Sequence, residues 1–397
     1  MTTDALAGVT VLDLTRVMSG PYCTLMLADM GARVIKVEHP RHGDDTRAWG
    51  PPFISGESAY FLSVNRNKDS LTLDFKQPDG RRILDALVDR ADVLVENFRP
   101  GTLQRLGLDY ASVAPRAPRL IYASISGYGH TGPLSSLAGI DAVTQAEGGL
   151  MSVTGDPAGA PFRLGLPIAD LVSGLFAAQG ILLALLQRAT TGRGRHVDIS
   201  MLDSVAALLT YQASAYLATG DNPQRMGNAH SSIVPYGAFD ARDGQLILSV
   251  GNDDQWWRFC EVAGLPELAI DERFATNPQR VVNRHLLQPI LVRVMLTRDR
   301  ADWTERLRPA GVPCGAVRTV GETLDDPQLQ ARGMITAMHH AIAGELRLVA
   351  SPIKLSDSPS RADRPPPTLG EHTDAILTNE LGFSDEELRD LRQRQVV

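Results

Sequence analysis

Short β-rich runs alternate with helical patterns along the N-terminal half of the chain, and this alternation constrains the fold more than any other feature. The runs predict five strands, at Val9–Leu14, Val34–Glu38, Leu71–Phe75, Val93–Asn97 and Leu120–Ser126. Between them the apolar spacing predicts helices, at Tyr22–Met30 and Pro78–Asp92. Strands separated by helices form a parallel sheet covered on both faces, because crossover connections are right-handed. The pattern therefore predicts an α/β fold, with a doubly wound, Rossmann-like large domain over residues 1–220.

The strand–helix alternation stops near residue 221, where a loop-like stretch begins. A strand is predicted at Gln245–Val250, and amphipathic helices at Gln255–Val262 and Arg284–Leu296. These elements predict a smaller α+β domain over residues 225–325.

The C-terminal segment, residues 330–397, is expected to return to the large domain. Within it, Ser356–Leu369 is rich in proline, which predicts an extended surface strap. Ser384, followed three residues later by Glu387, predicts a helix that opens with a capping box.

Charge and cysteine spacing exclude several classes of protein. Lys and Arg total 39 against 46 Asp and Glu, a net charge of −7, and no basic stripe suggests a nucleic-acid partner. Cys23, Cys260 and Cys314 are too far apart for a zinc knuckle or a disulfide framework. The histidines lack metal-ligand spacing, so no metal site is expected. The reduced cysteines, and an N-terminus without a basic region, favour a cytoplasmic protein.

The most apolar stretch of the chain is Leu171–Leu186. It is short for a membrane span and contains Ser173 and Gln179, so a buried core helix is predicted and no membrane partner is expected.

Asp170 comes directly before that apolar helix, and two roles fit its position. Aspartate is a preferred helix N-cap, because its carboxylate accepts hydrogen bonds from first-turn amides. The same amides and the helix dipole would keep the carboxylate ionised, and an ionised carboxylate in a partly dry cleft can attack an acyl group. The two roles are compatible.

The loops after the predicted strands are where ligands bind in an open α/β sheet. The loop after the first strand reads TRVMSGPYC, without the GxGxxG turn of dinucleotide-binding enzymes, which counts against a nicotinamide dehydrogenase. Arg99 and Arg105 follow a later strand and are candidate anion contacts. Arg47 could pair with a carboxylate or phosphate in a bidentate manner, although a solvated loop is the simpler interpretation.

Several segments together resemble the class III CoA-transferases, the family of formyl-CoA transferase and the carnitine-related CoA-transferases. The similarity extends over nearly the whole chain, and the shared order of the segments makes it specific. They include VLDLTRVMSGPYCTLMLADMGARVIKVEHPRHGDDTR, NRNKDSLTLDF, VENFRPGTLQRLGL, ASISGYGHTGP, ADLVSGLFAAQGILLAL, TGRGRHVDISMLDS and LGEHTDAILTNELGFS.

The resemblance implies that Asp170 is the catalytic nucleophile, and that coenzyme A enters as a substrate with no prosthetic group. It also implies an interlocked, ring-like homodimer with the active site between chains. The CoA contacts it implies are Val17, Met18, Ser19, His39, Leu73, Asp74, Phe75, Lys76, Asn97, Phe98, Arg99 and Arg105.

Substrate choice within the family follows from smaller differences. The segment GNAHSSIVPYG lacks the glycine run of formyl-CoA transferase, so the chain is more similar to the branch that exchanges CoA between succinate and dicarboxylates such as glutarate. Arg47, Arg225 and His230 are candidate contacts for the substrate, and exposed loops remain the alternative for them.

Two alternatives to a CoA-transferase stay open. The family contains α-methylacyl-CoA racemases, which use a histidine just before an aspartate as a proton-transfer group. Here the dipeptide is Ile140–Asp141, and isoleucine cannot carry a proton, so a racemase or acyl-CoA isomerase would lack half its chemistry. A CoA-binding protein without turnover is the alternative from another class.

Overall fold

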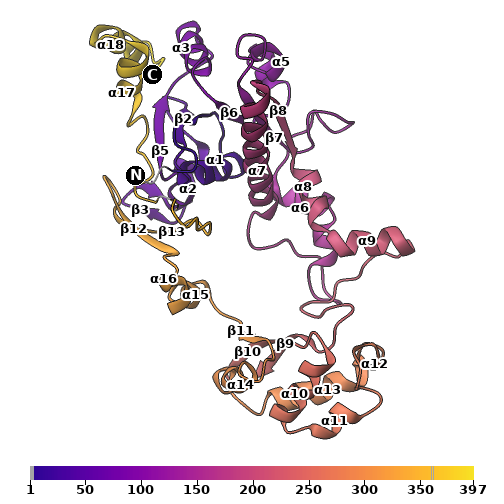
Figure 1. The fold of residues 1–397 in the computed structure, drawn as a ribbon. Coiled ribbons are helices and arrows are strands. Elements are labelled where there is room, and N and C mark those ends of the chain that lie inside the picture. Colours follow the sequence, from indigo (N-terminus) through magenta and orange to yellow (C-terminus); the bar gives the residue numbers. More distant parts are fainter. Residues whose placement is uncertain (1–3, 359, 361) are drawn as a thin grey trace. The chain divides into compact units, whose positions relative to one another are not determined.

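The computed structural model describes residues 4–358, 360 and 362–397 (Figure 1). The first three residues of the chain and positions 359 and 361 of the Pro-rich segment lie outside the described residues. A six-stranded parallel sheet of order β5-β2-β1-β6-β7-β8 forms the centre of the larger part of the chain. Its strands are β1 (Thr10–Asp13), β2 (Arg33–Glu38), β5 (Lys68–Thr72), β6 (Val93–Glu96), β7 (Ile121–Ser126) and β8 (His196–Ser200).

This strand order is that of a doubly wound fold. The chain adds β2 and β5 on one side of β1, and then β6, β7 and β8 on the other side, so the strand order reverses between β1 and β6. The predicted α/β class and parallel sheet are therefore confirmed. The strand predicted at Leu71–Phe75 begins earlier, at Lys68, whose buried ammonium group pairs with Asp13 of β1 instead of facing solvent. β8 was not predicted, since its polar residues hide the apolar alternation.

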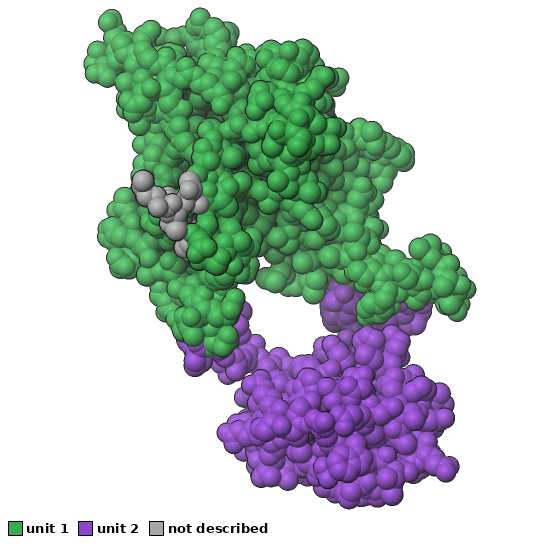
Figure 2. All heavy atoms as spheres, in the orientation of Figure 1, with its two compact units in different colours: residues 1–151, 163–221, 328–397 green, residues 152–162, 222–327 purple. Residues whose placement is uncertain are grey.

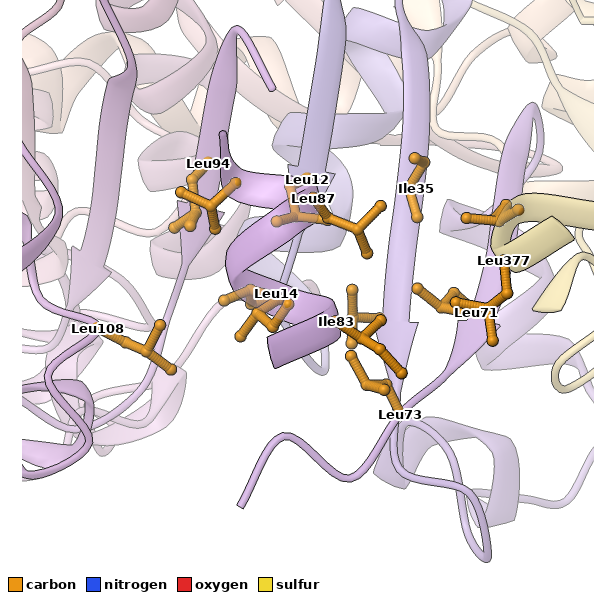
Figure 3. Close-up of a cluster of buried hydrophobic side chains, with 14 of the residues drawn as sticks. Leu12, Leu14, Ile35, Leu71, Leu73, Ile83, Leu87, Leu94, Leu108 and Leu377 are labelled. Carbon is orange, nitrogen blue, oxygen red and sulfur yellow. The ribbon is translucent and has the colours of Figure 1, made fainter. Parts of the chain in front are cut away.

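Helices cover both faces of the sheet. On one face α1 (Ser19–Asp29) and α7 (Ile168–Thr191) pack against side chains such as Val11, Val34 and Val93. On the other face α3 (Pro78–Val88) places Ile83 and Leu87 against Leu12, Ile35 and Leu94 (Figure 3). Successive strand residues point to opposite faces, so these near-continuous apolar strands can fill two cores at once.

The C-terminal segment completes the second of these cores. Helices α17 (Thr373–Leu381) and α18 (Asp385–Gln393) follow the Pro-rich segment, and Leu377 lies beside Leu71 at the edge strand β5 (Figure 3). The backbone N–H of Asp74 donates to the carbonyl oxygen of Val396 at 2.8 Å. The predicted capping box is confirmed, because the Ser384 hydroxyl accepts from the Glu387 N–H while the Glu387 carboxylate accepts from the Ser384 N–H.

The chain divides into two compact units, coloured separately in Figure 2. Unit 1 comprises residues 1–151, 163–221 and 328–397, and unit 2 comprises residues 152–162 and 222–327. The segment 152–162 thus belongs to unit 2, whereas the sequence had suggested the large domain. Unit 2 has a three-stranded antiparallel sheet and a helical layer around the buried Trp256 and Trp303. Its main elements are β9 (Tyr236–Ala241), β10 (Gly244–Ser249), β11 (Cys314–Ala316), α10 (Asp253–Ala263), α11 (Pro266–Ile270), α12 (Asn277–Val282), α13 (Arg284–Met295) and α14 (Arg300–Leu307).

Shorter elements complete unit 1. They are the hairpin β3 (Phe53–Ile54) and β4 (Glu57–Ser58), the hairpin β12 (Ile335–His340) and β13 (Gly344–Val349), and the helices α2 (Ala59–Val64), α4 (Thr102–Arg105), α5 (Tyr110–Val113), α6 (Asp141–Glu147), α8 (Met201–Leu208) and α9 (Thr210–Thr219).

Helix α7 contributes one face to the core, as expected of a buried core helix, but its other face is exposed. By length and apolar composition alone it is the one candidate membrane span among the described residues. One of its faces, with Ala177 and Ile181, is buried against the sheet, because small side chains allow close packing. The opposite face exposes Leu183 and Leu186, which are 59% and 70% accessible.

Candidate active site

A pocket of about 450 Å³ lies at the carboxyl ends of β1, β6 and β7. This is the point, between β1 and β6, where the order of the strands along the sheet reverses. Loops after these strands form its wall, and the first turn of α7 brings Asp170 into it. This is the position at which open α/β sheets bind ligands. Its lining includes Arg16, Val17, Ser19, Trp49, Tyr60, Asn97, Phe98, Arg99, Gly127, Gly139, Ile140, Asp141 and Asp170.

Asp170 does not cap α7, and the sequence-based interpretation of this residue as an N-cap is wrong. The helix begins at Ile168 after Pro167, so Asp170 already lies within the first turn. The first-turn amide is satisfied from another element, because Oδ1 of Asp141 accepts from the Ala169 N–H at 2.8 Å. The carboxyl group of Asp170 is therefore not used to cap its own helix, and it lines the pocket.

The environment of Asp170 also differs from the expected one. Burial, together with the negative charge of Asp141, raises the pKa of Asp170 to about 7, although a hydrogen bond with the Ser19 hydroxyl acts in the opposite direction. The expectation that helix amides keep this carboxyl fully ionised is thus wrong. A carboxyl with a pKa near neutrality, in a cleft, is typical of a functional site.

Tyr60 faces the same pair of carboxyl groups. Burial, followed by the charges of Asp170 and Asp141, raises its pKa to about 12, so the phenol stays neutral. The Trp49 ring packs edge-on against the Tyr60 ring, with 5.3 Å between centroids. Together these two aromatic rings give the pocket an apolar wall beside the carboxyl groups.

Asn97 fixes the loop that follows β1. Its Oδ1 accepts from the Arg16 N–H at 2.9 Å, and its Nδ2 donates to the Arg16 carbonyl oxygen at 2.7 Å. Nδ2 also lies 3.4 Å from Oγ of Ser19, the residue that hydrogen-bonds Asp170. Asn97 therefore links the loop after β1 to the Ser19 hydroxyl, which hydrogen-bonds the Asp170 carboxyl.

Two glycines bring separate parts of the pocket wall into contact. A Cβ atom at Gly127 would lie 2.4 Å from Cα of Gly139, and one at Gly139 would lie 2.2 Å from Cα of Gly127. Only residues without a side chain fit here, because the two backbones touch. The segments SGYG and LAGID contain these glycines, but nothing in the sequence indicates that they pair.

A second pocket, of about 250 Å³, adjoins the first, since Arg16 and Phe98 line both. The Phe98 ring packs against the Phe75 ring at 6.3 Å, and the Arg16 guanidinium lies 5.3 Å from the Phe98 ring centre. Many of the residues that the family resemblance implies for CoA come together in this pocket: His39, Leu73, Asp74, Phe75, Lys76 and Phe98.

The remaining residues implied for CoA lie around these pockets in different ways. Val17, Ser19, Asn97 and Arg99 line the pocket of Asp170. The side chain of Met18 is instead buried in a small apolar cluster. Arg105, at the end of α4, is not among the lining residues of either pocket, and its guanidinium lies 3.5 Å from the Thr102 hydroxyl.

Arg47 is committed to the protein scaffold, which corrects its assignment to the substrate. Its Nε and Nη2 atoms each lie 2.7 Å from a carboxylate oxygen of Glu38, and its guanidinium stacks 3.7 Å from the Phe61 ring centre. The side chain is only 11% exposed. The sequence correctly suggested a bidentate carboxylate partner, but that partner is internal.

Arg225 and His230 belong to unit 2, whereas Asp170 belongs to unit 1. Arg225 donates to the carbonyl oxygens of Asp156 and Gly159, at 3.3 and 2.8 Å, and so holds the segment 152–162. The Nδ1 atom of His230 accepts from the Ser232 N–H at 3.0 Å.

Sequence reasoning missed Trp49 and Tyr60, and treated Asp141 only as part of a racemase pattern. The two aromatic residues come from the segment after β2, whose path back to the pocket has no periodic pattern. Within the described part of the chain, no group of three or more His, Cys, Asp or Glu side chains is arranged to hold a metal ion.

Comparisons with known proteins indicate the family of the chain. The model of CoA-transferase family III matches residues 6–373. The chain is 43% identical over 380 residues to the succinyl-CoA:glutarate CoA-transferase of Mus musculus, covering 96% of this chain and 87% of that protein. It is 42% identical to the succinate–glutarate CoA-transferase of Agrobacterium fabrum, covering 94% of each.

A solved structure extends the agreement to three dimensions. A CaiB/BaiF family protein from Brucella suis superimposes with a TM-score of 0.86 at 43% sequence identity, covering 95% of this chain and 99% of that one. The chain therefore belongs to CoA-transferase family III and is a class III CoA-transferase.

Proposed function

We propose that this enzyme transfers CoA from succinyl-CoA to a free dicarboxylic acid such as glutarate, through covalent intermediates on Asp170. Two relatives above 40% identity carry names with this pair of substrates, which supports the choice. The observation that supports the mechanism is the environment of the Asp170 carboxyl. It lines the pocket at the carboxyl ends of β1, β6 and β7, has a pKa of about 7, and does not cap its own helix.

The proposed reaction begins when an Asp170 carboxylate oxygen attacks the thioester carbonyl carbon. The carbon–sulfur bond breaks, giving an aspartyl–acyl anhydride and CoA thiolate. The thiolate then attacks the Asp170 carbonyl carbon, which releases the first acid as a carboxylate and leaves a thioester between Asp170 and CoA. The incoming acid repeats these steps in reverse order, so no net proton, electron or water is consumed.

Backbone amides of α1 are suited to stabilise the oxyanions of these steps. The helix begins beside Asp170, at Ser19, and has no side-chain cap. The N–H groups of Ser19 and Gly20 are therefore suited as donors, whereas Pro21 has no N–H and the Tyr22 N–H donates to the carbonyl oxygen of Met18. One such donor can contribute about 3 kcal/mol to an oxyanionic transition state. The apolar wall of Trp49 and Tyr60 would limit water, which could otherwise hydrolyse the anhydride.

The substitution Asp170→Ala tests this function. We expect it to abolish CoA transfer and covalent labelling by radiolabelled succinyl-CoA, while folding and CoA binding persist. Asp203 offers a matched control, because it occupies the same first-turn position on α8 but is exposed at the surface. Asp203→Ala should keep both activities. Transfer by Asp170→Ala at a rate near wild type would refute the covalent mechanism.

The homodimer implied by the family resemblance is part of the same proposal, as is a cytoplasmic location. A second copy of this chain would cover the exposed leucines of α7, such as Leu183 and Leu186, and the exposed Leu217 of α9. The three cysteines are free thiols, as a reducing compartment requires. The mass in solution, measured by light scattering for the wild type and for Leu183→Lys, tests the dimer. A wild-type monomer would refute it.

A contact between the distal carboxylate of the acid and Arg225 or His230 remains a prediction. Both residues belong to loops of unit 2, and either side chain could donate a hydrogen bond to a second carboxylate. Comparing KM for glutarate with KM for a monocarboxylic acid, in Arg225→Met and wild type, tests this contact. Only the dicarboxylate should be affected.

A further inference from the structure

Val17 adopts a backbone conformation that its side chain disfavours. Its φ angle is +71°, in the left-handed region, although valine is β-branched. Such conformations persist only when the surroundings enforce them, and they cluster at functional sites. Val17 lies in the loop between β1 and α1, two residues before Ser19, which hydrogen-bonds Asp170.

The buried ion pair between Lys36 and Asp44 contacts this loop. Nζ of Lys36 lies 2.9 Å from Oδ2 of Asp44, and both side chains are fully inaccessible to solvent. Lys36 also donates to the carbonyl oxygen of Thr15 at 2.9 Å. Asp44 accepts from the Val17 N–H, at 3.2 Å to Oδ1 and 3.3 Å to Oδ2. The pair thus holds the main chain on both sides of Arg16.

The ion pair has a fixed geometry, because Asp44 has further partners. Its Oδ1 accepts from the N–H and the hydroxyl of Thr46, at 3.0 and 2.7 Å. Burial alone would raise the pKa of Asp44, but Lys36 and Thr46 lower it well below the ordinary value, so the group stays charged. Buried ion pairs are weak sources of stability, since desolvation offsets their attraction, so this pair calls for another explanation.

We propose that Lys36 and Asp44 are positioning residues that hold Val17 in its left-handed conformation and thereby aim the first turn of α1 at Asp170. The proposal rests on the proposed function, in which that turn stabilises the acyl intermediates. Without the two hydrogen bonds to the loop, Val17 would relax to negative φ. The Ser19 hydroxyl and the first-turn amides would then turn away from the reacting carboxyl.

The decisive experiment combines the ion pair with position 17. The background is Lys36→Met with Asp44→Ala, which removes both charges, so that neither is left buried alone, and also removes the hydrogen bonds to Thr15 and Val17. In single-turnover labelling of Asp170 by succinyl-CoA, we expect this double variant to be slower by about 100-fold, the usual effect of a small misplacement of reacting groups. Adding Val17→Gly should restore about tenfold, because glycine adopts positive φ without the steric penalty. Adding Val17→Ala should restore nothing.

Asp29 and Arg66 provide a matched control. They form a buried ion pair at the other end of α1, with side chains 2% and 3% exposed. Asp29→Asn should lower the melting temperature and leave the labelling rate of the folded protein unchanged. This separates loss of stability from loss of positioning.

The outcomes distinguish the two proposals. A wild-type enzyme that transfers CoA without label on Asp170 would refute the proposed function, and with it this inference. Normal labelling of the wild type, together with equally fast labelling of the Lys36→Met, Asp44→Ala variant, would refute only the positioning role. Equal rescue by Val17→Gly and Val17→Ala would also refute it, because the conformation of Val17 would then be irrelevant.

Discussion

Asp141 and Asp170 meet at the N-terminal turn of helix α7. The Asp141 carboxylate accepts a hydrogen bond from a backbone N–H of the helix, and the Asp170 carboxyl lines the pocket. Asp141 accepts from the Ala169 N–H at 2.8 Å and from Nε2 of Gln145 at 2.8 Å. After burial, its charge is the main factor that raises the pKa of Asp170 to about 7. The carboxyl group proposed as the nucleophile therefore lies near the midpoint of its titration at neutral pH, and this relationship leads to the first predictions.

The rate of Asp170 acylation should rise with pH through about 7, because only the carboxylate form attacks the thioester. Asp141→Asn removes the neighbouring negative charge and should move the midpoint to lower pH. Single-turnover labelling over a pH series measures both. A pH-independent rate between about pH 5.5 and 8.5 would contradict the raised pKa.

Ser19→Ala should move the same midpoint in the opposite direction. The Ser19 hydroxyl donates to the Asp170 carboxylate and lowers its pKa, so its removal favours the protonated form. The expected result is a midpoint above that of the wild type and slower labelling at pH 7. Asp141→Asn, Ser19→Ala and the wild type should be compared in one buffer series, since the order of their three midpoints is the test.

Stability should depend on Asp170 with the opposite sign to an ordinary surface carboxylate. Folding raises this pKa from 3.8 to about 7, so the neutral form stabilises the native state at low pH, and that contribution is lost as pH rises through about 7. Asp170→Asn should therefore raise the free energy of unfolding by about 2–4 kcal/mol at pH 8, and change it little at pH 4. Urea unfolding of freshly prepared protein at both pH values measures this. A larger gain at pH 4 would contradict the assigned shift.

Asn97→Ala should slow acylation by about 10–100-fold and leave the fold intact, because Asn97 holds Arg16 and Ser19 and itself lies at the pocket surface. Asn283→Ala, which removes hydrogen bonds to main-chain oxygens in unit 2, serves as the control. Steady-state kinetics should show a fall in kcat for Asn97→Ala only. An unchanged kcat would remove Asn97 from the positioning of Ser19.

Arg47→Met tests the reassignment of Arg47 from substrate to scaffold. It leaves the buried Glu38 carboxylate without its bidentate partner, which typically costs about 3–5 kcal/mol. The melting temperature should fall, while KM for the acid stays at the wild-type value in the protein that remains folded. A raised KM without a loss of stability would instead favour the substrate contact.

The sheet could be predicted from the sequence because each buried strand is a short apolar run, and such runs depend on local composition. Five of the six parallel strands follow from this pattern. β8 does not, because His196, Asp198 and Ser200 alternate with its apolar residues. Lys68 begins β5 although lysine usually lies at a surface, and its burial is explained by contacts with Asp13, Asn65 and the carbonyl oxygen of Pro21, which only the fold brings together.

The site could be predicted only where one residue carries a recognisable position. Asp170 at the start of the apolar helix is such a residue. Its environment could not be predicted, because Ser19, Tyr60 and Asp141 approach it from three other elements. The cap of α7 illustrates the difficulty, since the chain supplies an aspartate at the expected place and the fold uses Asp141 instead.

The packing of the C-terminal helices against β5 has a consequence for cotranslational folding. The core beneath α3 includes Leu377, Leu388 and Val396, which are translated after all of unit 2. Unit 2 can therefore fold while the N-terminal part of unit 1, which is translated earlier, still exposes the apolar side chains that the C-terminal helices later cover. Chaperones that bind during translation should accordingly favour the N-terminal part of unit 1.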